Sequence, residues 1–511
     1  MRKTIAITFL VFVSMTVFAQ TVTTSSKQVV GKNIINGKEI LGIKYQFSDP
    51  IYNCKRDTAN NRFIIQLRGI NGKYYKNNGS VLVFDLKTQQ ILWFKELNYA
   101  KQEVEQYENV LFITSEKKIE RINMTTGETM WTTNCRLLST IPNLNISLGT
   151  KYNAFMDKYE KIKAIDLNTG KISWERGIDY NYGINGVMNL NDTAIIFKAA
   201  GLHQMNLKTG KGWDYDAVTG AFDYRRTVGA NVAGVALGLL TGAFIVSTGH
   251  DLVSETISNV ASDSLNYYFA SKEYIAAINH AGKLVWKTKL PSETSSSTLF
   301  YKKDTIYMIN FGEAKYNGKT VDYGKPYLGA YDKKTGNRLF MNIRTESKNP
   351  ILEYLLSKDS VELYFRKGVG KYSLRNGYST KDISFDEKET GNLSYEVSHS
   401  IIYTKSDSTY KNLSEQNPKS MFFMTTKNNV VQLNENFEIE RTIKLNDLYL
   451  KKLKTENCVY LYLDKSISII NKDHLKIGEM NLGENLMKIG NKLYEINENY
   501  ITEIELDKEY Q

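Results

Sequence analysis

A carboxylate, a hydroxyl, a glycine turn and an indole lie within nine residues at 166–174 (DLNTGKISW). The carboxylate of Asp166 could ligate a cation, and the indole of Trp174 offers a large apolar face with one N–H. The same residues also suit a tight turn. Asp166 can accept hydrogen bonds from the backbone amides that follow it, and Gly170 can adopt the positive φ that the turn requires.

Recurrence of the motif decides between these two interpretations. Related stretches start at Asp85, Asn123, Asn206, Asn279 and Asp332. The chain has five Trp residues, and all of them occupy the end of this motif: Trp93, Trp131, Trp174, Trp213 and Trp286. The turn glycines are Gly127, Gly170, Gly210, Gly282 and Gly336. Because a repeated unit is typical of architecture, we expect the carboxylates to cap turns rather than to bind a ligand.

Successive copies of the motif start about 40 residues apart, and short apolar runs typical of strands lie between them. This period, with its glycine turns, is typical of propeller blades that have about four strands each. Six clear copies and two or three weaker ones after Phe340 predict an all-β fold. We expect a β-propeller of four-stranded blades, with eight blades favoured and seven as the alternative.

The pattern apolar-x-Asp/Asn-x-x-Thr-Gly-x-x-x-Trp resembles the repeat of the quinoprotein-like (PQQ-like) β-propeller family. The resemblance is strong over residues 81–340 and weaker over the rest of 45–510. It implies that the five Trp side chains dock between neighbouring blades and have a structural role. It also implies two classes of function, a protein-binding scaffold like the outer-membrane protein assembly propeller and a quinone-dependent dehydrogenase.

The scaffold function is the one we predict. A quinoprotein dehydrogenase of alcohols or sugars needs carboxylates and an amide around calcium together with a catalytic Asp, and many members also have a vicinal disulfide. No two cysteines are adjacent in this chain, and its five His are dispersed. We therefore predict no catalytic residue, metal or cofactor, and PQQ with calcium belongs only to the alternative. Carbohydrate binding by Tyr-rich loops such as 316–327 is a third alternative.

The N-terminal segment predicts where the protein is located, and the charge pattern argues against nucleic acid as a partner. Residues 1–19 have the form of a secretory signal, with Arg2 and Lys3 before an apolar stretch and small residues before Gln20. We expect residues 20–511 to form one exported propeller domain in the periplasm or cell envelope. The formal charge is +11, but the Lys residues are interspersed with Glu along the chain. This pattern is typical of a solvated surface, so we predict no nucleic-acid groove.

An insertion at about 214–265 interrupts the repeat. Within it, residues 228–247 (VGANVAGVALGLLTGAFIVS) are apolar and carry no charge. We expect a Gly-rich, helical insertion that packs on the propeller, dips into a membrane or docks a partner protein of the envelope. The side chains predicted to make membrane or partner contact are Val232, Val235, Leu237, Leu239, Leu240, Phe244 and Ile245.

The cysteines are odd in number, so at least one is unpaired. Cys54 and Cys458 fall in the first and last parts of the repeat, which a closed ring brings together. Two alternatives follow, a Cys54–Cys458 disulfide that locks the ring and three free thiols that include Cys135.

Overall fold

The computed structural model describes residues 23–24, 27–153, 158–159, 161–178, 185–217, 253–254, 256–316, 319–343, 349–397, 402–406, 409–413, 418–507 and 510. Strands dominate this part of the chain, with short 3₁₀ turns such as Pro142–Leu144 between them. None of the described helices is long and apolar enough to span a membrane. Residues 228–247, and with them every predicted contact residue from Val232 to Ile245, lie outside the described residues.

Eight separate four-stranded antiparallel sheets follow one another along the described chain. The first four are β4 (Ile51–Asp57), β5 (Arg62–Asn71), β6 (Tyr74–Asp85) and β7 (Gln90–Asn98); β8 (Glu103–Tyr107), β9 (Val110–Thr114), β10 (Ile119–Ile122) and β11 (Thr129–Thr133); β12 (Arg136–Ile141), β13 (Ile146–Thr150), β16 (Ile162–Asp166) and β17 (Ile172–Arg176); and β18 (Gly186–Asn191), β19 (Ala194–Lys198), β20 (Gly201–Asn206) and β21 (Asp214–Asp216). The other four are β23 (Ala261–Ser262), β24 (Asn266–Ala270), β25 (Tyr274–Asn279) and β26 (Leu284–Lys289); β27 (Ser297–Lys302), β28 (Thr305–Asn310), β31 (Tyr327–Asp332) and β32 (Arg338–Ile343); β33 (Ile351–Leu356), β34 (Ser360–Phe365), β35 (Gly368–Ser373) and β36 (Ser379–Ser384); and β37 (Leu393–Glu396), β40 (Met421–Thr425), β41 (Asn429–Leu433) and β42 (Ile439–Lys444).

The middle strands of these sheets explain the continuous apolar runs in the sequence. Every residue of β9 and of β13 is buried, whereas β36 has no buried residue and alternates between exposed and half-buried positions after Ser379. A strand that is covered on both faces must be apolar at consecutive positions, because neighbouring sheets pack against each face. The apolar runs therefore mark inner strands, and the alternating ones mark the outer edge of each sheet.

A twelve-stranded sheet joins the two ends of the chain. Its order is β39-β38-β43-β44-β45-β46-β2-β3-β49-β48-β47, and β1 pairs with β3. The strands are β1 (Thr23–Thr24), β2 (Gln28–Asn33), β3 (Glu39–Gln46), β38 (Ile402–Ser406), β39 (Thr409–Asn412), β43 (Tyr449–Lys454), β44 (Cys458–Leu463), β45 (Ser466–Asn471), β46 (Lys476–Met480), β47 (Leu486–Ile489), β48 (Lys492–Ile496) and β49 (Tyr500–Glu505). The N-terminal strand β3 thus becomes the fourth strand of a blade whose other strands, β47 to β49, end the chain.

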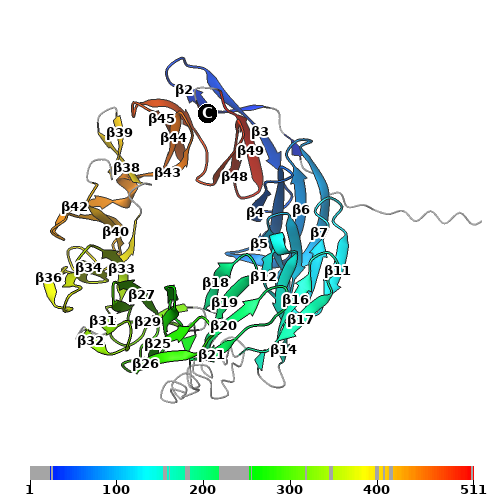
Figure 1. Cartoon of the computed structure of the whole chain (residues 1–511). Coiled ribbons are helices and arrows are strands. Elements are labelled where there is room, and N and C mark those ends of the chain that lie inside the picture. Colours follow the sequence, from blue (N-terminus) through cyan, green and yellow to red (C-terminus); the bar gives the residue numbers. More distant parts are fainter. Residues whose placement is uncertain are drawn as a thin grey trace, which may run out of the picture.

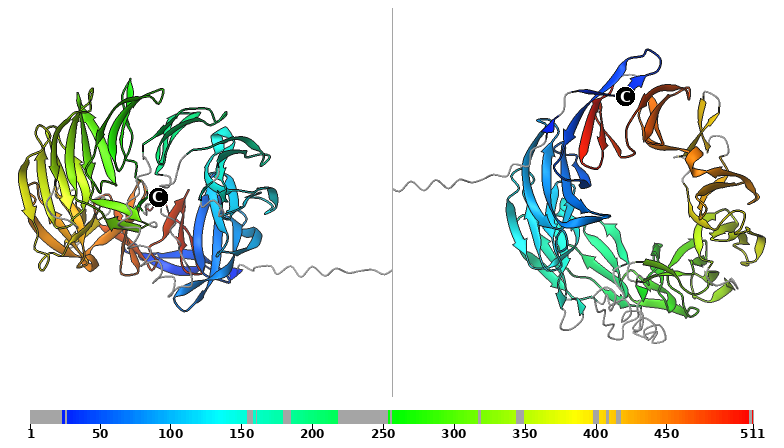
Figure 2. Two further views of the ribbon diagram at one scale, coloured as in Figure 1. Left: turned by 90° about the horizontal axis from the view of Figure 1, so that it is seen from below. Right: turned by 180° about the vertical axis from the view of Figure 1, so that it is seen from behind.

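The sheets are arranged in a ring around a central opening, and the first strands lie beside the last ones (Figure 1). The view from behind shows the same juxtaposition of blue and red strands (Figure 2). Backbone pairing closes the ring, from Gly42 opposite Ile504 to Gln46 opposite Tyr500. The fold is an all-β propeller. The preferred number of eight blades is not confirmed, because the twelve-stranded sheet adds strands to the eight separate sheets.

The order of the strands determines which turns and connections lie at each end of the ring. Consecutive antiparallel strands place the first and third turns of a blade at one end, which we call the turn face. The second turn and the connection to the next blade lie at the opposite end, which we call the loop face. Asp85 and Asp166 begin third turns and define the turn face, whereas Gly72 and Ala100 belong to the loop face.

Most elaborations of the blade pattern emerge at the loop face. These are the tip of the β5–β6 hairpin, the hairpin β14 (Tyr152–Asn153) to β15 (Lys158–Tyr159), the hairpin β29 (Glu313–Tyr316) to β30 (Lys319–Asp322), and the long connection between β21 and β23. The β38–β39 hairpin is different, since it joins a first strand to a second one and so leaves the turn face. Most of the described elaborations therefore start and end at the loop face.

The three cysteines are free thiols. Cys54 lies in β4 and Cys458 in β44, and the blade formed by β47, β48, β49 and β3 stands between their two blades. The alternative of a Cys54–Cys458 disulfide is therefore wrong. The reason is the further blade at the closure, which carries no Trp motif in the sequence.

We expect the buried thiols to resist modification in the folded chain. Burial raises the pKa of Cys135 to about 11, so at pH 8 its thiol stays protonated and is a poor nucleophile. Ellman's reagent should react slowly with the folded protein and should count three thiols once the protein is denatured. A count of one thiol in the denatured, unreduced protein would indicate a disulfide and would contradict this structure.

Candidate functional site

Each Trp of the motif lies against the turn glycine of the next blade. Trp131, at the end of one blade, donates its Nε1–H to the carbonyl of Leu167 at 2.6 Å. Gly170 faces the same indole so closely that a Cβ on it would lie 2.7 Å from Cδ2 of Trp131. Its φ is +68°. Glycine is thus required here twice, for its backbone conformation and for the space that the indole occupies.

The same geometry recurs at the other four tryptophans. Their Nε1–H groups donate to the carbonyls of Met124 (from Trp93, 2.9 Å), Leu207 (from Trp174, 2.7 Å), His280 (from Trp213, 2.9 Å) and Lys333 (from Trp286, 3.0 Å). The glycines that face these indoles are Gly127, Gly210, Gly282 and Gly336, in the same order. The motif residues are therefore brought together in pairs, and each pair spans two blades.

A second contact reinforces several of these pairs, and we did not anticipate it from the sequence. The residue two positions after the aromatic donates a hydrogen bond to the carbonyl of the same turn glycine. The bonds are Thr133 Oγ1 to Gly170 (2.6 Å), Arg176 Nη1 to Gly210 (3.2 Å), Thr288 Oγ1 to Gly336 (2.6 Å) and Asn342 Nδ2 to Gly377 (2.7 Å). In the sequence, the polar residue that recurs two positions after the aromatic residue could have indicated this contact.

The carboxylates of the motif are engaged in their own turns. Oδ1 of Asp332 accepts hydrogen bonds from the hydroxyl of Thr335 at 2.8 Å and from the backbone N–H of Thr335 at 2.8 Å. These bonds hold the pKa of Asp332 below its ordinary value. In Asp85 the backbone N–H of Thr88 is the main cause of the same lowering. Such carboxylates stabilise turns.

One further copy of the pair lies beyond the tryptophans. Phe340 packs on Gly377, where a Cβ would lie 2.4 Å from Cδ2 of the ring. The turn starts at Ser373, whose carbonyl accepts from the N–H of Gly377 at 2.8 Å. This turn belongs to one of the weaker copies after Phe340 that the sequence predicts. The Asn376-Gly377 dipeptide within it is a common turn signal.

A charged cluster joins two blades near the insertion. Oδ2 of Asp263 accepts from Lys333 Nζ at 2.9 Å and from the hydroxyl of Tyr268 at 2.9 Å. Its Oδ1 accepts from the backbone N–H groups of Leu265 and Asn266, each at 2.9 Å. Burial alone raises the pKa of Asp263, but these hydrogen bonds outweigh it, so the pKa lies below the ordinary value.

We expect Asp263→Asn to lower the free energy of unfolding by about 2 kcal/mol at pH 7, because it removes a charge-assisted network between blades. A lowered pKa in the folded state contributes stability above the unfolded value near pH 4, and this contribution is lost as the pH falls. The difference from the wild type should therefore shrink below about pH 4. Urea unfolding at pH 7 and pH 3.5 measures it. Glu435→Gln, which breaks the exposed ion pair with Lys419, is the control and should change little.

On the loop face, two hollows meet at Ala100, in the loop between β7 and β8. One, of about 520 Å³, extends over β8 and the β9–β10 loop and has charged walls that include Glu103, Glu116 and Lys117. The other, of about 570 Å³, lies against the β5–β6 hairpin and has tyrosine and asparagine walls. A third hollow, of about 580 Å³, lies against β38 and the β42–β43 connection. Hollows of this kind, and not the repeated motif, are candidate binding sites among the described residues.

A metal or quinone site is not supported by the donor set. Within the described ranges, no three His, Cys, Asp or Glu residues are grouped so that they could hold a metal ion. The motif carboxylates, which were the most plausible ligands in the sequence, have turn amides as partners instead. The described residues therefore do not fit calcium with a quinone, and we derive no chemistry from such a group.

The comparisons with known proteins concern the fold. No protein-family model matches the chain, and no curated protein matches it. Among solved structures, it is similar to BamB from Moraxella catarrhalis, with a TM-score of 0.33 and 10% identity over 81% of this chain and 99% of that one. It is also similar to the quinohemoprotein alcohol dehydrogenase ADHIIG from Pseudomonas putida HK5, with a TM-score of 0.33 and 10% identity over 75% and 71%.

A third match is apo AztD from Citrobacter koseri, with a TM-score of 0.29 and 8% identity over 75% of this chain and 94% of that one. These neighbours have PQQ-like propeller folds, the kind that the Trp motif resembles. At such TM-scores and identities they carry no argument about function. The assignment of the fold rests on the strand order, which was described above.

Proposed function

We propose that this chain is an exported, non-catalytic β-propeller that binds a partner protein of the cell envelope and acts as a scaffold. The observation that carries the proposal is that the two faces of the ring differ in structure. The repeated motif, with its Trp, Asp and Gly residues, joins blades at the turn face. The connection that contains residues 228–247 starts after β21 and ends before β23, and both of these described ends lie at the loop face.

The far end of that connection is tied to a neighbouring loop-face element. β22 (Val253–Ser254) pairs with β29, with Val253 opposite Tyr316 and Ser254 opposite Lys315. The connection thus ends on the β29–β30 hairpin, which makes a three-stranded sheet with it. In our proposal the five tryptophans have a structural, blade-docking role, and residues 228–247 contact the partner or a membrane surface.

Site-specific photo-crosslinking in cells tests which face the partner uses. A photoreactive amino acid is placed at Lys101 or Lys117 on the loop face and at Lys87 or Lys208 on the turn face; all four side chains are exposed. We expect discrete crosslinked adducts from the loop-face positions only, and weaker ones when residues 228–247 are deleted. Adducts from the turn face alone, or from neither face, would contradict the proposal.

Membrane contact through residues 228–247 has its own prediction. If these residues dip into a bilayer, the full-length protein should float with liposomes, and the variant that lacks 228–247 should remain at the bottom of the gradient. Equal behaviour of the two proteins would show that the segment makes no such contact. In that case, contact with a partner protein would be the remaining role proposed for residues 228–247.

A further inference from the structure

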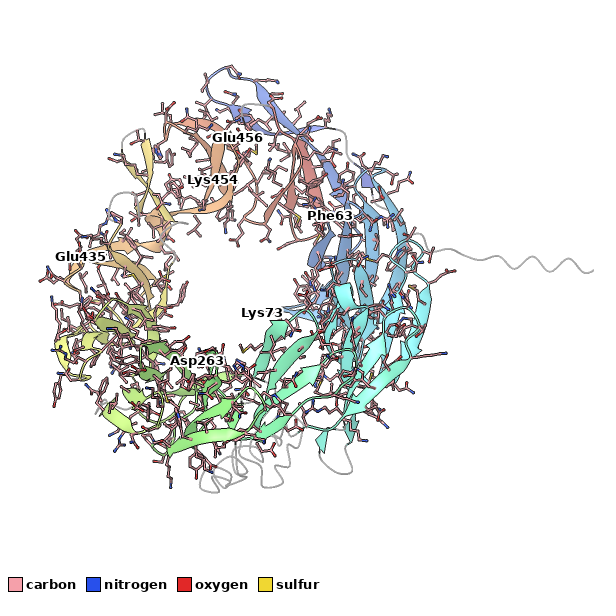
Figure 3. The ribbon with its side chains drawn as sticks, viewed as in Figure 1. Phe63, Lys73, Asp263, Glu435, Lys454 and Glu456 are labelled. Atoms are coloured by element: carbon pink, nitrogen blue, oxygen red, sulfur yellow. The ribbon has the colours of Figure 1, made fainter. Side chains whose placement is uncertain are left out.

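The β5–β6 hairpin extends past its own blade. β5 has 10 residues and β6 has 12. The pairing of β5 with β4 ends at Leu67 opposite Ile51, and that of β6 with β7 ends at Asn78 opposite Asn98. Residues 69–77 therefore project beyond the neighbouring strands at the loop face. Figure 3 shows Lys73, at the tip, on the inner edge of the ring beside the central opening.

An arginine braces the projecting hairpin. The guanidinium Cζ of Arg68 lies 4.6 Å from the ring centroid of Tyr52, 5.4 Å from that of Tyr75 and 4.9 Å from that of Tyr99. Its Nε donates to the carbonyl of Lys76 at 2.9 Å. The rings of Tyr52 and Tyr75 also contact each other edge to face, with centroids 5.1 Å apart. Arg68 is thus held within the structure, and Tyr75 is fixed in place before any ligand arrives.

The hollow beside this hairpin combines aromatic rings with neutral amides. Tyr74 is 80% exposed and Tyr75 is 42% exposed. The hollow of about 570 Å³ that they line is also lined by Asn71, Asn77, Asn78 and Asn98. Among the described residues, the side chains of Asn71, Asn77 and Asn78 are exposed. Each of these amides presents both a donor and an acceptor to an incoming molecule.

This chemistry selects one class of ligand. A sugar ring has apolar C–H faces that pack on an aromatic ring, and its hydroxyl groups donate and accept hydrogen bonds at once, as an asparagine amide does. Among the residues that the structure describes, no carboxylate lines the hollow, and Lys76 is the one charged side chain that does. A peptide of strong positive charge or a metal ion would find no counter-charge there. A lipid chain would leave the amides without partners.

We propose that the hollow at the β5–β6 hairpin binds a polysaccharide, with sugar rings against Tyr74 and Tyr75 and hydroxyl groups on the asparagine amides. The site does not depend on the protein contact proposed above. It also differs in place from the Tyr-rich loop 316–327, for which the sequence offers carbohydrate binding as an alternative. We place the site at the β5–β6 hairpin because its tip carries exposed tyrosines and is braced by Arg68.

A polysaccharide microarray of plant, microbial and animal glycans tests the proposal with the whole mature chain. We expect the wild type to bind at least one polysaccharide, and calorimetry with that polysaccharide to show at least a tenfold weaker Kd for Tyr74→Ala and for Asn78→Ala. Tyr378→Ala is the matched control, because Tyr378 is 72% exposed and lies at the turn face. It should bind like the wild type. All three variants replace exposed side chains, and equal melting temperatures check their folding.

Three results would overturn the proposal. The first is that no polysaccharide on the array binds the wild type. The second is that Tyr74→Ala and Asn78→Ala bind the identified polysaccharide as tightly as the wild type does. The third is that Tyr378→Ala weakens binding to the same extent, which would place the site elsewhere. Loss of the photo-crosslinks in Tyr74→Ala without any glycan binding would assign the hollow to the partner protein instead.

Discussion

Gly170→Ala is expected to lower the free energy of unfolding by about 3 kcal/mol, whereas Gly37→Ala should lower it by about 1 kcal/mol. Both glycines have a positive φ, +68° and +73°. They differ in their surroundings. A Cβ on Gly37 meets nothing within 4 Å, but on Gly170 it would lie 2.7 Å from Trp131. Gly37 therefore isolates the cost of the backbone conformation, and the difference between the two variants measures the cost of displacing the indole.

Urea unfolding followed by circular dichroism measures both losses. Equal losses at Gly170 and Gly37 would show that the indole gives way freely and that the contact between blades contributes nothing. A double variant gives an independent check. When Trp131→Ala removes the indole, adding Gly170→Ala should cost only about 1 kcal/mol, because the steric conflict is gone and the backbone strain remains.

Trp131→Ala is expected to destabilise the protein by about 3–5 kcal/mol, the range for deleting a large buried aromatic side chain. Trp131 is 9% exposed, donates to the carbonyl of Leu167 and covers Gly170. Trp131→Phe keeps much of the packing and loses the N–H donor. It should cost less, with about 1 kcal/mol from the hydrogen bond and the rest from the smaller ring.

Trp213→Ala provides the comparison within the same chain. Trp213 is half-buried, and its Nε1–H donates to the carbonyl of His280, which follows Asn279 just as the acceptor follows the first turn residue in the other copies. We therefore expect a smaller loss of stability than in Trp131→Ala, as measured by the urea midpoint and the melting temperature. A larger loss at Trp213 than at Trp131 would contradict the view that burial and the second contact at Thr133 determine the strength of each junction.

The repeated motif shows why much of this fold was predictable. The Asp166 turn closes within five residues, by hydrogen bonds from Thr169 and from Gly170 to the start of the turn. Local chemistry of this kind is written in neighbouring residues, so each copy can be found in the sequence. The docking of Trp on the next blade was implied by the family resemblance. That it meets the turn glycine face on required the three-dimensional arrangement.

Contacts between distant residues could not be predicted in the same way. β3 pairs with β49 although more than 450 residues separate them, and neither strand carries a Trp motif. The blade count of eight therefore remained unconfirmed, and the disulfide between Cys54 and Cys458 proved wrong. The polysaccharide site was missed because Tyr52, Arg68 and Tyr99 come from three separate strands and loops.

The all-β class and the turn chemistry depend on residues within one repeat, so both can be predicted from the sequence alone. The closure of the ring, the face at which the elaborations start, and the gathering of aromatic and amide side chains beside a projecting hairpin became visible only in three dimensions. The physical reason is that strand pairing and burial of side chains between blades are set by non-local contacts. A motif of nine residues therefore specifies how one turn folds, whereas the exposed surfaces depend on how all the blades pack around the ring.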